Sequence, residues 1–221
     1  MDGNQIAIDG PSASGKSTVA RLVAERMNAY YVNTGEMYRT LTWVVRNRGI
    51  DPTVNPEAVE ALLDEIEIRY ALVDGSLTLT CDDEVVDLSE VRKPQVTAQV
   101  SQVAKIPAVR TWMVARQKQS AELGLVVAEG RDIGTVVFPD AKWKFFVTAS
   151  PEERARRRLA QDGETSDGAT LQEVALQIAE RDRIDSTRKV SPLKQADDAV
   201  LVDTTGMSID EVLDFVTSKI K

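Results

Sequence analysis

The segment GPSASGKS, residues 10–17, constrains this chain more than any other feature of its sequence. It matches the pattern G-x-x-x-x-G-K-[ST] at every fixed position. The apolar run QIAID (5–9) before it predicts a buried strand, and the spacing of the residues after it predicts a helix. In such a turn the glycines let the backbone approach phosphate oxygens, while loop N–H groups and the helix N-terminus attract their charge. The segment therefore predicts a phosphate-binding loop (P-loop) for a nucleoside triphosphate.

The residues of the P-loop are expected to have separate tasks. Lys16 is expected to reach the β- and γ-phosphates, and the Ser17 hydroxyl is expected to be a ligand of Mg²⁺. The predicted ATP-binding residues of the loop are Gly10, Pro11, Ser12, Ala13, Ser14, Gly15, Lys16, Ser17 and Thr18. A switch-type GTPase would need a guanine-reading [NT]-K-x-D segment, which this sequence lacks, and a motor or large ATPase is usually longer. Transfer of the γ-phosphoryl group to a small acceptor is the remaining option.

Charge and composition exclude several other classes of function. The 221 residues carry a formal net charge of −8, so an anionic ligand must be held by local basic clusters, and no nucleic-acid partner is expected. Histidine is absent, which excludes His triads, His metal sites and His acid–base catalysis. No apolar run has membrane-spanning length, no secretory signal is visible, and one cysteine excludes an internal disulfide framework. We therefore expect a cytoplasmic protein without a membrane partner.

Short apolar runs alternate with helical stretches along most of the chain. Strands are expected at 5–9, 29–33, 123–130, 142–150 and 198–204. Helices are expected at 16–28, 35–49, 55–66, 94–104, 107–122 and 170–188, and capping boxes begin at Ser150, Thr170 and Ser208. This alternation predicts an α/β fold of the P-loop NTPase type, with a five-stranded parallel sheet covered by helices on both sides.

The segment 66–81 interrupts this alternation. Two runs of alternating apolar residues flank Asp74-Gly75, which is typical of a β-hairpin. Cys81 falls in the apolar phase of the second run, so we expect it in a core. We expect one domain over 1–221, with a core of 1–65 and 105–221 and a small antiparallel β and helix insert at about 66–104.

A phosphoryl acceptor requires a second anion site that faces the P-loop. In an open parallel sheet ligands lie beyond the carboxyl ends of the strands. Arg39 follows the second expected strand and Arg131 follows the third, so both are candidates for this site. Surface ion pairing is the alternative for each of them.

The segment ERDRIDSTR, residues 180–188, collects charges of both signs in one expected helix. Helical spacing places Arg181, Asp185 and Arg188 on one stripe of the helix and Arg183 on a different face. Spacing alone leaves two interpretations open, a ligand clamp and a solvated face of weak ion pairs.

Five segments together resemble the bacterial cytidylate kinases, a family of P-loop nucleoside monophosphate kinases. They are GPSASGKST, NTGEMYR, SQVAKIPAVR, GRDIGTVVFPDA and ERDRIDSTRKVSPL, and the resemblance covers nearly the whole chain. GRDIGTVVFPDA is specific within nucleoside monophosphate kinases, whereas the P-loop is not. The resemblance implies transfer from ATP to CMP or dCMP with Mg²⁺, and a monophosphate-binding role for the insert at 66–104.

The resemblance also implies roles for individual residues. Ser101, Arg110 and Asp132 would read the cytosine, and Thr34, Tyr38, Arg39 and Arg131 would hold the acceptor phosphate. Arg181 and Asp185 would contact the sugar, and Arg188 would contact the phosphates. Lys16, Arg131, Arg181 and Arg188 are then the expected catalytic charges, and Glu129 is expected to orient a water on Mg²⁺.

Two positions depart from the family pattern, and a lid is implied. Many members have Ser in place of Thr34 and Asp in place of Glu129, and each change keeps the needed hydroxyl or carboxylate. The implied lid covers about 154–170, where Arg154 and Arg158 share a helix face; Arg158 is the expected ATP contact, and a solvated basic helix is the alternative. Nothing in the sequence requires more than a monomer.

Two other functions remain open from the sequence. The alternatives to transfer to CMP or dCMP are a P-loop kinase for another small acceptor, such as UMP, and a nucleotide-binding regulator without turnover. The intact Lys16 and Ser17 favour an enzyme over the regulator.

Overall fold

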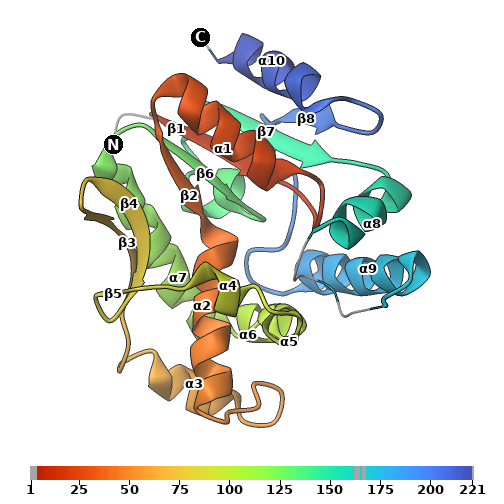
Figure 1. The fold of residues 1–221 in the computed structure, drawn as a ribbon. Helices are drawn as coiled ribbons and strands as arrows, with labels where there is room; N and C mark the ends of the chain where they lie inside the picture. Colours follow the sequence, from red (N-terminus) through yellow and green to blue (C-terminus); the bar gives the residue numbers. More distant parts are fainter. Residues whose placement is uncertain (1–3, 162–164, 166–167, 221) are drawn as a thin grey trace.

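A parallel sheet forms the frame of the molecule. The computed structural model describes residues 4–161, 165 and 168–220. The strand order is β2 (Tyr30–Asn33), β6 (Val126–Gly130), β1 (Gln5–Asp9), β7 (Trp143–Thr148) and β8 (Val200–Asp203), and every neighbouring pair is parallel. The predicted five-stranded parallel sheet is therefore confirmed, with the strand that precedes the P-loop at its centre (Figure 1).

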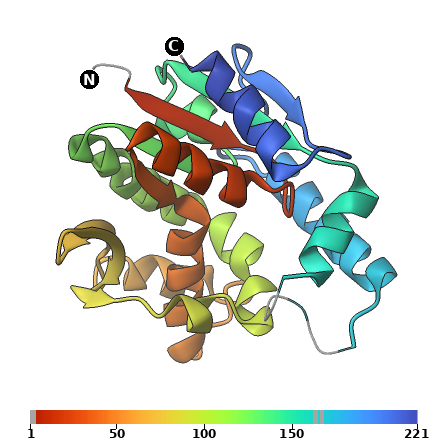
Figure 2. The ribbon, with the colours of Figure 1, turned by 45° about the horizontal axis from the view of Figure 1, so that its top comes forward.

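Helices cover both faces of this sheet because its central strands are apolar on both sides. Ile6 and Ile8 of β1 pack against α1 (Lys16–Met27) and α10 (Ile209–Lys219). Ala7, between them, faces the other side, which is covered by α7 (Pro107–Gln119), the 3₁₀ helix η1 (Ser120–Leu123) and the π-helical segment η2 (Ile133–Val137). Figure 2 shows α1 in front of the sheet and the C-terminal helix beside it.

A second group of elements lies below the sheet in Figure 1. The helix α2 (Thr34–Asn47) runs down into it from β2, and α3 (Pro56–Leu62) follows. A three-stranded antiparallel sheet is formed by β3 (Ile68–Val73), β4 (Ser76–Cys81) and β5 (Glu84–Val85), which confirms the predicted hairpin. Three short helices come next: α4 (Leu88–Val91), α5 (Pro94–Thr97) and α6 (Val100–Ala104).

One apolar cluster holds this second group together. It joins Leu41 of α2 and Val59 of α3 to Ile68 of β3, Val100 of α6 and Met113 of α7. Cys81 packs against the same cluster and is partly buried. Residues before 66 therefore share this packing unit, and the predicted bounds of the insert stay a prediction.

Two helices flank the sheet on the right of Figure 1. They are α8 (Pro151–Leu159) and α9 (Leu171–Thr187), and they pack through Ala155, Val174 and Ile178. The capping boxes predicted at Thr170 and Ser208 are present. Residues 162–164 and 166–167 of the predicted lid lie outside the described residues.

The capping box predicted at Ser150 forms only in part. The Ser150 hydroxyl accepts the Glu153 N–H at 3.2 Å, but the Glu153 carboxylate binds Arg157 at 2.9 Å instead of returning to the cap. The Ser150 N–H donates to the Thr205 hydroxyl at 2.8 Å, so a distant loop has replaced the local partner. No helix in the described part of the chain is long and apolar enough to cross a bilayer.

Candidate functional site

The P-loop lies between the end of β1 and the start of α1. Gly10 passes so close to β7 that a Cβ there would lie 2.0 Å from the Val147 carbonyl oxygen. Gly15 has φ +89°, a left-handed conformation that glycine adopts without strain, and it precedes the first residue of α1. Lys16 is buried and its Nζ donates to the Pro11 carbonyl oxygen at 2.9 Å. The loop is therefore folded back over its own lysine at a helix N-terminus.

A cluster of buried cations faces this loop. Burial, together with the positive charge of Arg131, lowers the pKa of Lys16 to about 7. Burial and neighbouring arginines lower the pKa of Arg158 and of Arg181 to about 9, and that of Arg39 to about 10. The positive charges destabilise one another in this site. An anion bound among them would reverse that effect.

Two adjoining cavities meet at this cluster. A cavity of about 370 Å³ contains the P-loop from Ser12 to Thr18 and the end of β6 at Glu129. A cavity of about 740 Å³ lies between α5, α6 and α9, and Ser101 faces it. Ser12, Arg158 and Arg181 line both cavities. The Nε of Arg181 is buried without a hydrogen-bond partner among the described residues, so a donor is available where the cavities join.

Behind the larger cavity, five charged side chains alternate in sign. Arg110 donates to Asp132, and Arg188 lies 3.7 Å from Asp132 and 3.6 Å from Asp185. Arg131 Nε donates to Asp185 Oδ2 at 3.0 Å. Burial would raise the pKa of Asp185, but Arg131 and the other arginines outweigh it and lower that pKa. We call this set the paired network.

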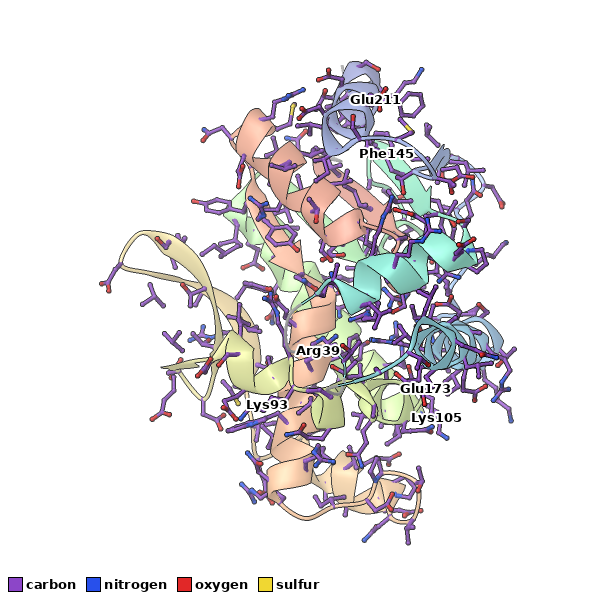
Figure 3. All side chains as sticks on the ribbon, turned by 45° about the vertical axis from the view of Figure 1, so that its right-hand side comes forward. Arg39, Lys93, Lys105, Phe145, Glu173 and Glu211 are labelled. Atoms are coloured by element: carbon purple, nitrogen blue, oxygen red, sulfur yellow. The ribbon has the colours of Figure 1, made fainter. Side chains whose placement is uncertain are left out.

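The remaining acceptor residues predicted from the sequence surround the paired network. The Tyr38 ring lies beneath Arg110, with its centroid 5.0 Å from the guanidinium carbon. The Ser101 hydroxyl donates to Asp185 Oδ1 at 3.3 Å. Arg39 lines the smaller cavity and donates to the Thr97 hydroxyl. Figure 3 labels Arg39 on α2, below the sheet residue Phe145.

Thr34 is placed differently from the other acceptor residues. Its side chain is buried and lines neither cavity. Its hydroxyl donates to the Glu129 carbonyl oxygen at 2.7 Å, and so connects the start of α2 to the end of β6. The joint is closely packed, since a Cβ on Gly130 would come within 2.6 Å of the Thr34 hydroxyl oxygen.

The residues predicted to hold Mg²⁺ lie in the smaller cavity. Ser17 is exposed there, and the buried Glu129 carboxylate accepts a hydrogen bond from the Tyr31 hydroxyl at 2.8 Å. A hydroxyl and a carboxylate beside a phosphate-binding loop are the oxygen donors that Mg²⁺ prefers. Among the described residues no group of three acidic, His or Cys side chains gathers to hold a metal. The donor set therefore fits a metal that is shared with a bound phosphate.

The arginines of α8 do not share one task. Arg158 donates to the Ser12 hydroxyl at 2.9 Å and lines both cavities. Arg154 lines neither cavity and is held by Asp182 and the Ser12 carbonyl oxygen. Arg157 donates to the Ser14 carbonyl oxygen at 3.1 Å. Of these three, only Arg158 lines a cavity.

Two acids beside the P-loop were not predicted from the sequence, the buried Asp9 and the partly buried Asp182. Asp9 ends β1 and accepts the N–H groups of Ile133 and Gly134 at 2.8 and 2.7 Å. Asp182 accepts the Ser12 N–H at 3.0 Å. A signal for Asp182 was present, because it continues the i, i+4 stripe of Val174 and Ile178 that is buried against α8.

Comparisons with known proteins agree with this geometry. A family model described as cytidylate kinase matches residues 6–221. A cytidylate kinase of Limosilactobacillus reuteri (strain DSM 20016) is 47% identical over 220 residues, which cover 99% of this chain and 96% of that protein. A crystal structure of an uncharacterized protein from Eubacterium ventriosum matches with a TM-score of 0.52 at 14% identity, covering 98% of this chain and 97% of the other, which supports the fold alone.

Some relatives are longer than this chain. A bifunctional pantoate ligase/cytidylate kinase of Synechococcus sp. (strain WH7803) is 52% identical over 213 residues, which cover 95% of this chain. The chain spans 43% of the length of that relative and 42% of a second bifunctional Synechococcus protein.

Proposed function

Because the chain belongs to the cytidylate kinase family, we propose that it transfers the γ-phosphoryl group of ATP to CMP or dCMP, giving ADP and CDP or dCDP. The observation that carries this proposal is the position of Arg181. Its guanidinium lies where the P-loop cavity joins the cavity beside Ser101, and its Nε has no hydrogen-bond partner among the described residues. A phosphoryl group in transit between two nucleotides would pass this point.

The donor binds in the smaller cavity. The loop residues 10–18 surround the phosphates, Lys16 contacts the β- and γ-phosphates, and Arg158 contacts the donor from α8. When the triphosphate enters, its charge offsets the repulsion that lowers the pKa values of Lys16, Arg158 and Arg181. Binding energy on this side is therefore largely electrostatic.

The acceptor binds in the larger cavity and against the paired network. Ser101, Arg110 and Asp132 offer a hydroxyl, a guanidinium and a carboxylate, which suit the O2 and N3 acceptors and the N4 donor of cytosine. Arg131 and Arg39, which line the smaller cavity, position the acceptor phosphate. Tyr38 and Thr34 line neither cavity and would act indirectly, Tyr38 by supporting Arg110 and Thr34 by joining α2 to β6. Asp185 and Arg181 contact the sugar, and Arg188 contacts the phosphates.

Catalysis in this proposal is positioning and charge neutralisation. Phosphoryl transfer passes through a loose transition state, so no strong base is required, and the absence of histidine is compatible with it. Lys16, Arg131, Arg181 and Arg188 surround the transferring group and offset its charge. Ser17 and Glu129, the latter through water, would hold Mg²⁺, which would neutralise the phosphate oxygens.

The test is coupled ADP release with ATP and Mg²⁺, with CMP, dCMP, UMP, AMP and GMP offered separately. Turnover with CMP and dCMP supports the proposal and the cytosine-reading set. Turnover only with another acceptor, such as UMP, keeps a P-loop kinase and rejects the roles of Ser101, Arg110 and Asp132. No acceptor-dependent turnover favours a nucleotide-binding regulator. The predicted monomer and the bounds of the lid stay predictions.

A further inference from the structure

The backbone of Ser12 in the P-loop forms a closed ring of hydrogen bonds with two side chains, one from α8 and one from α9. The Ser12 N–H donates to Asp182 Oδ1 at 3.0 Å, and Arg154 donates to the other carboxylate oxygen of Asp182. Arg154 Nη1 also donates to the Ser12 carbonyl oxygen at 3.0 Å. Asp182 lies on α9 and Arg154 on α8. Both backbone polar groups of Ser12 are therefore held by side chains of the neighbouring helices, and we call this contact the Ser12 ring.

The Ser12 ring is shielded from water. The Arg154 and Asp182 side chains are 11% and 18% exposed. Exposed pairs on the same helices differ, since Arg183 and Glu180 are 63% and 55% exposed. Removal of one partner from a shielded pair leaves the other charge poorly solvated, so the Ser12 ring is more sensitive to substitution than a surface pair.

Ala13 attaches the P-loop to the same two helices by an apolar contact. Its φ is +57°, a left-handed conformation that a residue with a Cβ adopts at a cost in energy. It packs against the cluster of Ala155, Val174 and Ile178, which belong to α8 and α9. The apolar contact and the Ser12 ring are independent observations, and both fix the loop to α8 and α9.

The residues that flank Asp182 on α9 face the acceptor. Arg181 lines both cavities, and Asp185, less than one turn further on, accepts a hydrogen bond from Arg131 at 3.0 Å. One turn of α9 therefore contacts the donor loop through Asp182 and the acceptor cavity through its neighbours. A shift of this turn would move the P-loop and the residues at the acceptor cavity together.

We propose that Asp182 is a positioning residue, which fixes the P-loop relative to the acceptor-binding turn of α9 and so sets the distance between the two nucleotides. This inference rests on the proposed phosphoryl transfer. The competing explanation is that Asp182 only stabilises the packing of α8 on α9. If Asp182 only stabilises packing, its substitution changes the free energy of unfolding alone. If Asp182 positions the P-loop, its substitution also changes the rate of phosphoryl transfer and the effect of one bound nucleotide on the affinity for the other.

Two variants and one control separate these explanations. Asp182→Asn keeps an oxygen that accepts the Ser12 N–H but loses the charge for Arg154, and Asp182→Ala loses both. Arg183→Gln is the matched control, because Arg183 lies one residue away and binds Glu180 on the exposed face. For each protein we would measure the unfolding midpoint, kcat, the KM for ATP and for CMP, and the Kd of ADP with and without CMP. ADP and CMP do not react with each other, so their coupling is measured at equilibrium.

We expect kcat to fall about 10-fold to 100-fold in Asp182→Ala, since hydrogen bonds to charged groups contribute about 1.5–3 kcal/mol, and to fall less in Asp182→Asn. The Kd of CMP alone is expected to change less than about threefold, because Asp182 lines neither cavity. The factor by which CMP changes the Kd of ADP is expected to move toward one in both variants. Arg183→Gln should keep the wild-type values.

A folded Asp182→Ala with wild-type kcat and the wild-type coupling factor would overturn the inference. If the alanine variant does not fold, the same comparison on Asp182→Asn decides: wild-type rate and coupling with a lowered midpoint would assign Asp182 to packing. Failure of the proposed function is distinguishable, because wild type and Arg183→Gln would then both lack CMP-dependent ADP release.

Discussion

The donor side and the acceptor side of the site are both rich in arginine, but they balance its charge differently. On the donor side, burial and neighbouring cations lower the pKa of Lys16 to about 7 and that of Arg158 to about 9. Arg181, which lines both cavities, has its pKa lowered to about 9 in the same way. On the acceptor side every arginine of the paired network faces an aspartate, as Arg110 faces Asp132. The donor side is short of negative charge, whereas the paired network, which lies against the acceptor, is close to balance.

The difference indicates how each side selects its ligand. A site with excess positive charge favours whatever brings the most negative charge, which suits a triphosphate. A balanced site gains little from charge, so discrimination depends on which hydrogen bonds the ligand can replace within the paired network. The base and sugar of the acceptor are uncharged and can be recognised by such hydrogen bonds. Substitutions on the two sides should therefore have different consequences.

Lys16→Ala should have the largest effect. Turnover is expected to fall by roughly 10³-fold or more, because the cation that contacts the transferring group is lost. The unfolding midpoint should stay the same or rise, since a buried cation with a lowered pKa is removed from the fold. Steady-state ADP release and thermal unfolding measure the two quantities. Lys118→Ala, on an exposed turn of α7, is the control. Near-normal turnover in Lys16→Ala would reject the P-loop assignment.

Asp132→Ala tests the balanced side. Its kcat/KM for CMP is expected to fall by on the order of 10²-fold, while the Kd of ADP stays within about twofold. The free energy of unfolding should fall by about 3–5 kcal/mol, because the Arg110 side chain, 1% exposed, is left without its carboxylate. Titrations with each nucleotide and denaturant unfolding measure these changes. Equal losses for ADP and CMP would make Asp132 structural, and Asp132→Asn provides a folded variant for the comparison.

Asp9 connects the two sides, and its titration gives a pH test. It ends β1 before the P-loop and accepts the Ile133 and Gly134 N–H groups, next to Asp132. Burial raises its pKa to about 7, against the opposing effect of those two hydrogen bonds. Because this pKa lies above the unfolded value of 3.8, the stability that Asp9 contributes is present below pH 4 and is lost as the pH rises through 7.

Asp9→Asn should remove this pH dependence. Between pH 4 and pH 7 the free energy of unfolding of the variant, relative to wild type, is expected to rise by a few kcal/mol. Denaturant unfolding at pH 4, 5, 6 and 7 gives the slope of the free energy of unfolding against pH. Asp214→Asn, which removes an exposed partner of Arg26, is the control. A slope equal to that of wild type would mean that Asp9 does not titrate in this window.

The fold followed from the sequence where local signals and tertiary contacts agree. Apolar runs predicted all strands of the parallel sheet, and Asp74-Gly75 predicted the hairpin. Boundaries were wrong where distant contacts decide. Residues 94–104 form two short helices, α5 and α6, and the strand expected from 123 begins at Val126, after a 3₁₀ turn. At Ser150 the partner that replaced Glu153 is Thr205, which no local rule finds.

Some residues of the candidate site were likewise predicted from local patterns, and others depend on distant contacts. A motif of fixed spacing predicted the P-loop, and helical periodicity predicted Arg181, Asp185 and Arg188 on one stripe with Arg183 on another face. Arg183 is exposed, but α9 ends at Thr187, so Arg188 lies beyond the helix in extended backbone. The spacing of Asp182 after Val174 and Ile178 indicates its helix face, but its role was not predicted, because its partners come from α8 and from a loop 170 residues earlier in the chain. Sequence spacing describes one element at a time, whereas these contacts depend on how three elements pack.

Ala13→Gly should have the smallest effect, and it tests how the donor loop is held. Glycine removes the strain of a φ of +57°, about 1–2 kcal/mol, but it also removes a methyl that packs on α8 and α9, about 0.8 kcal/mol. The two contributions oppose each other, so the free energy of unfolding should change by less than about 1 kcal/mol. Ala115→Gly, exposed within α7, is the matched control and should lose about 1 kcal/mol from helix propensity alone. A loss in Ala13→Gly as large as that of the control would show that packing of the methyl outweighs the strain, and that the donor loop is held by its apolar contact as well as by charge.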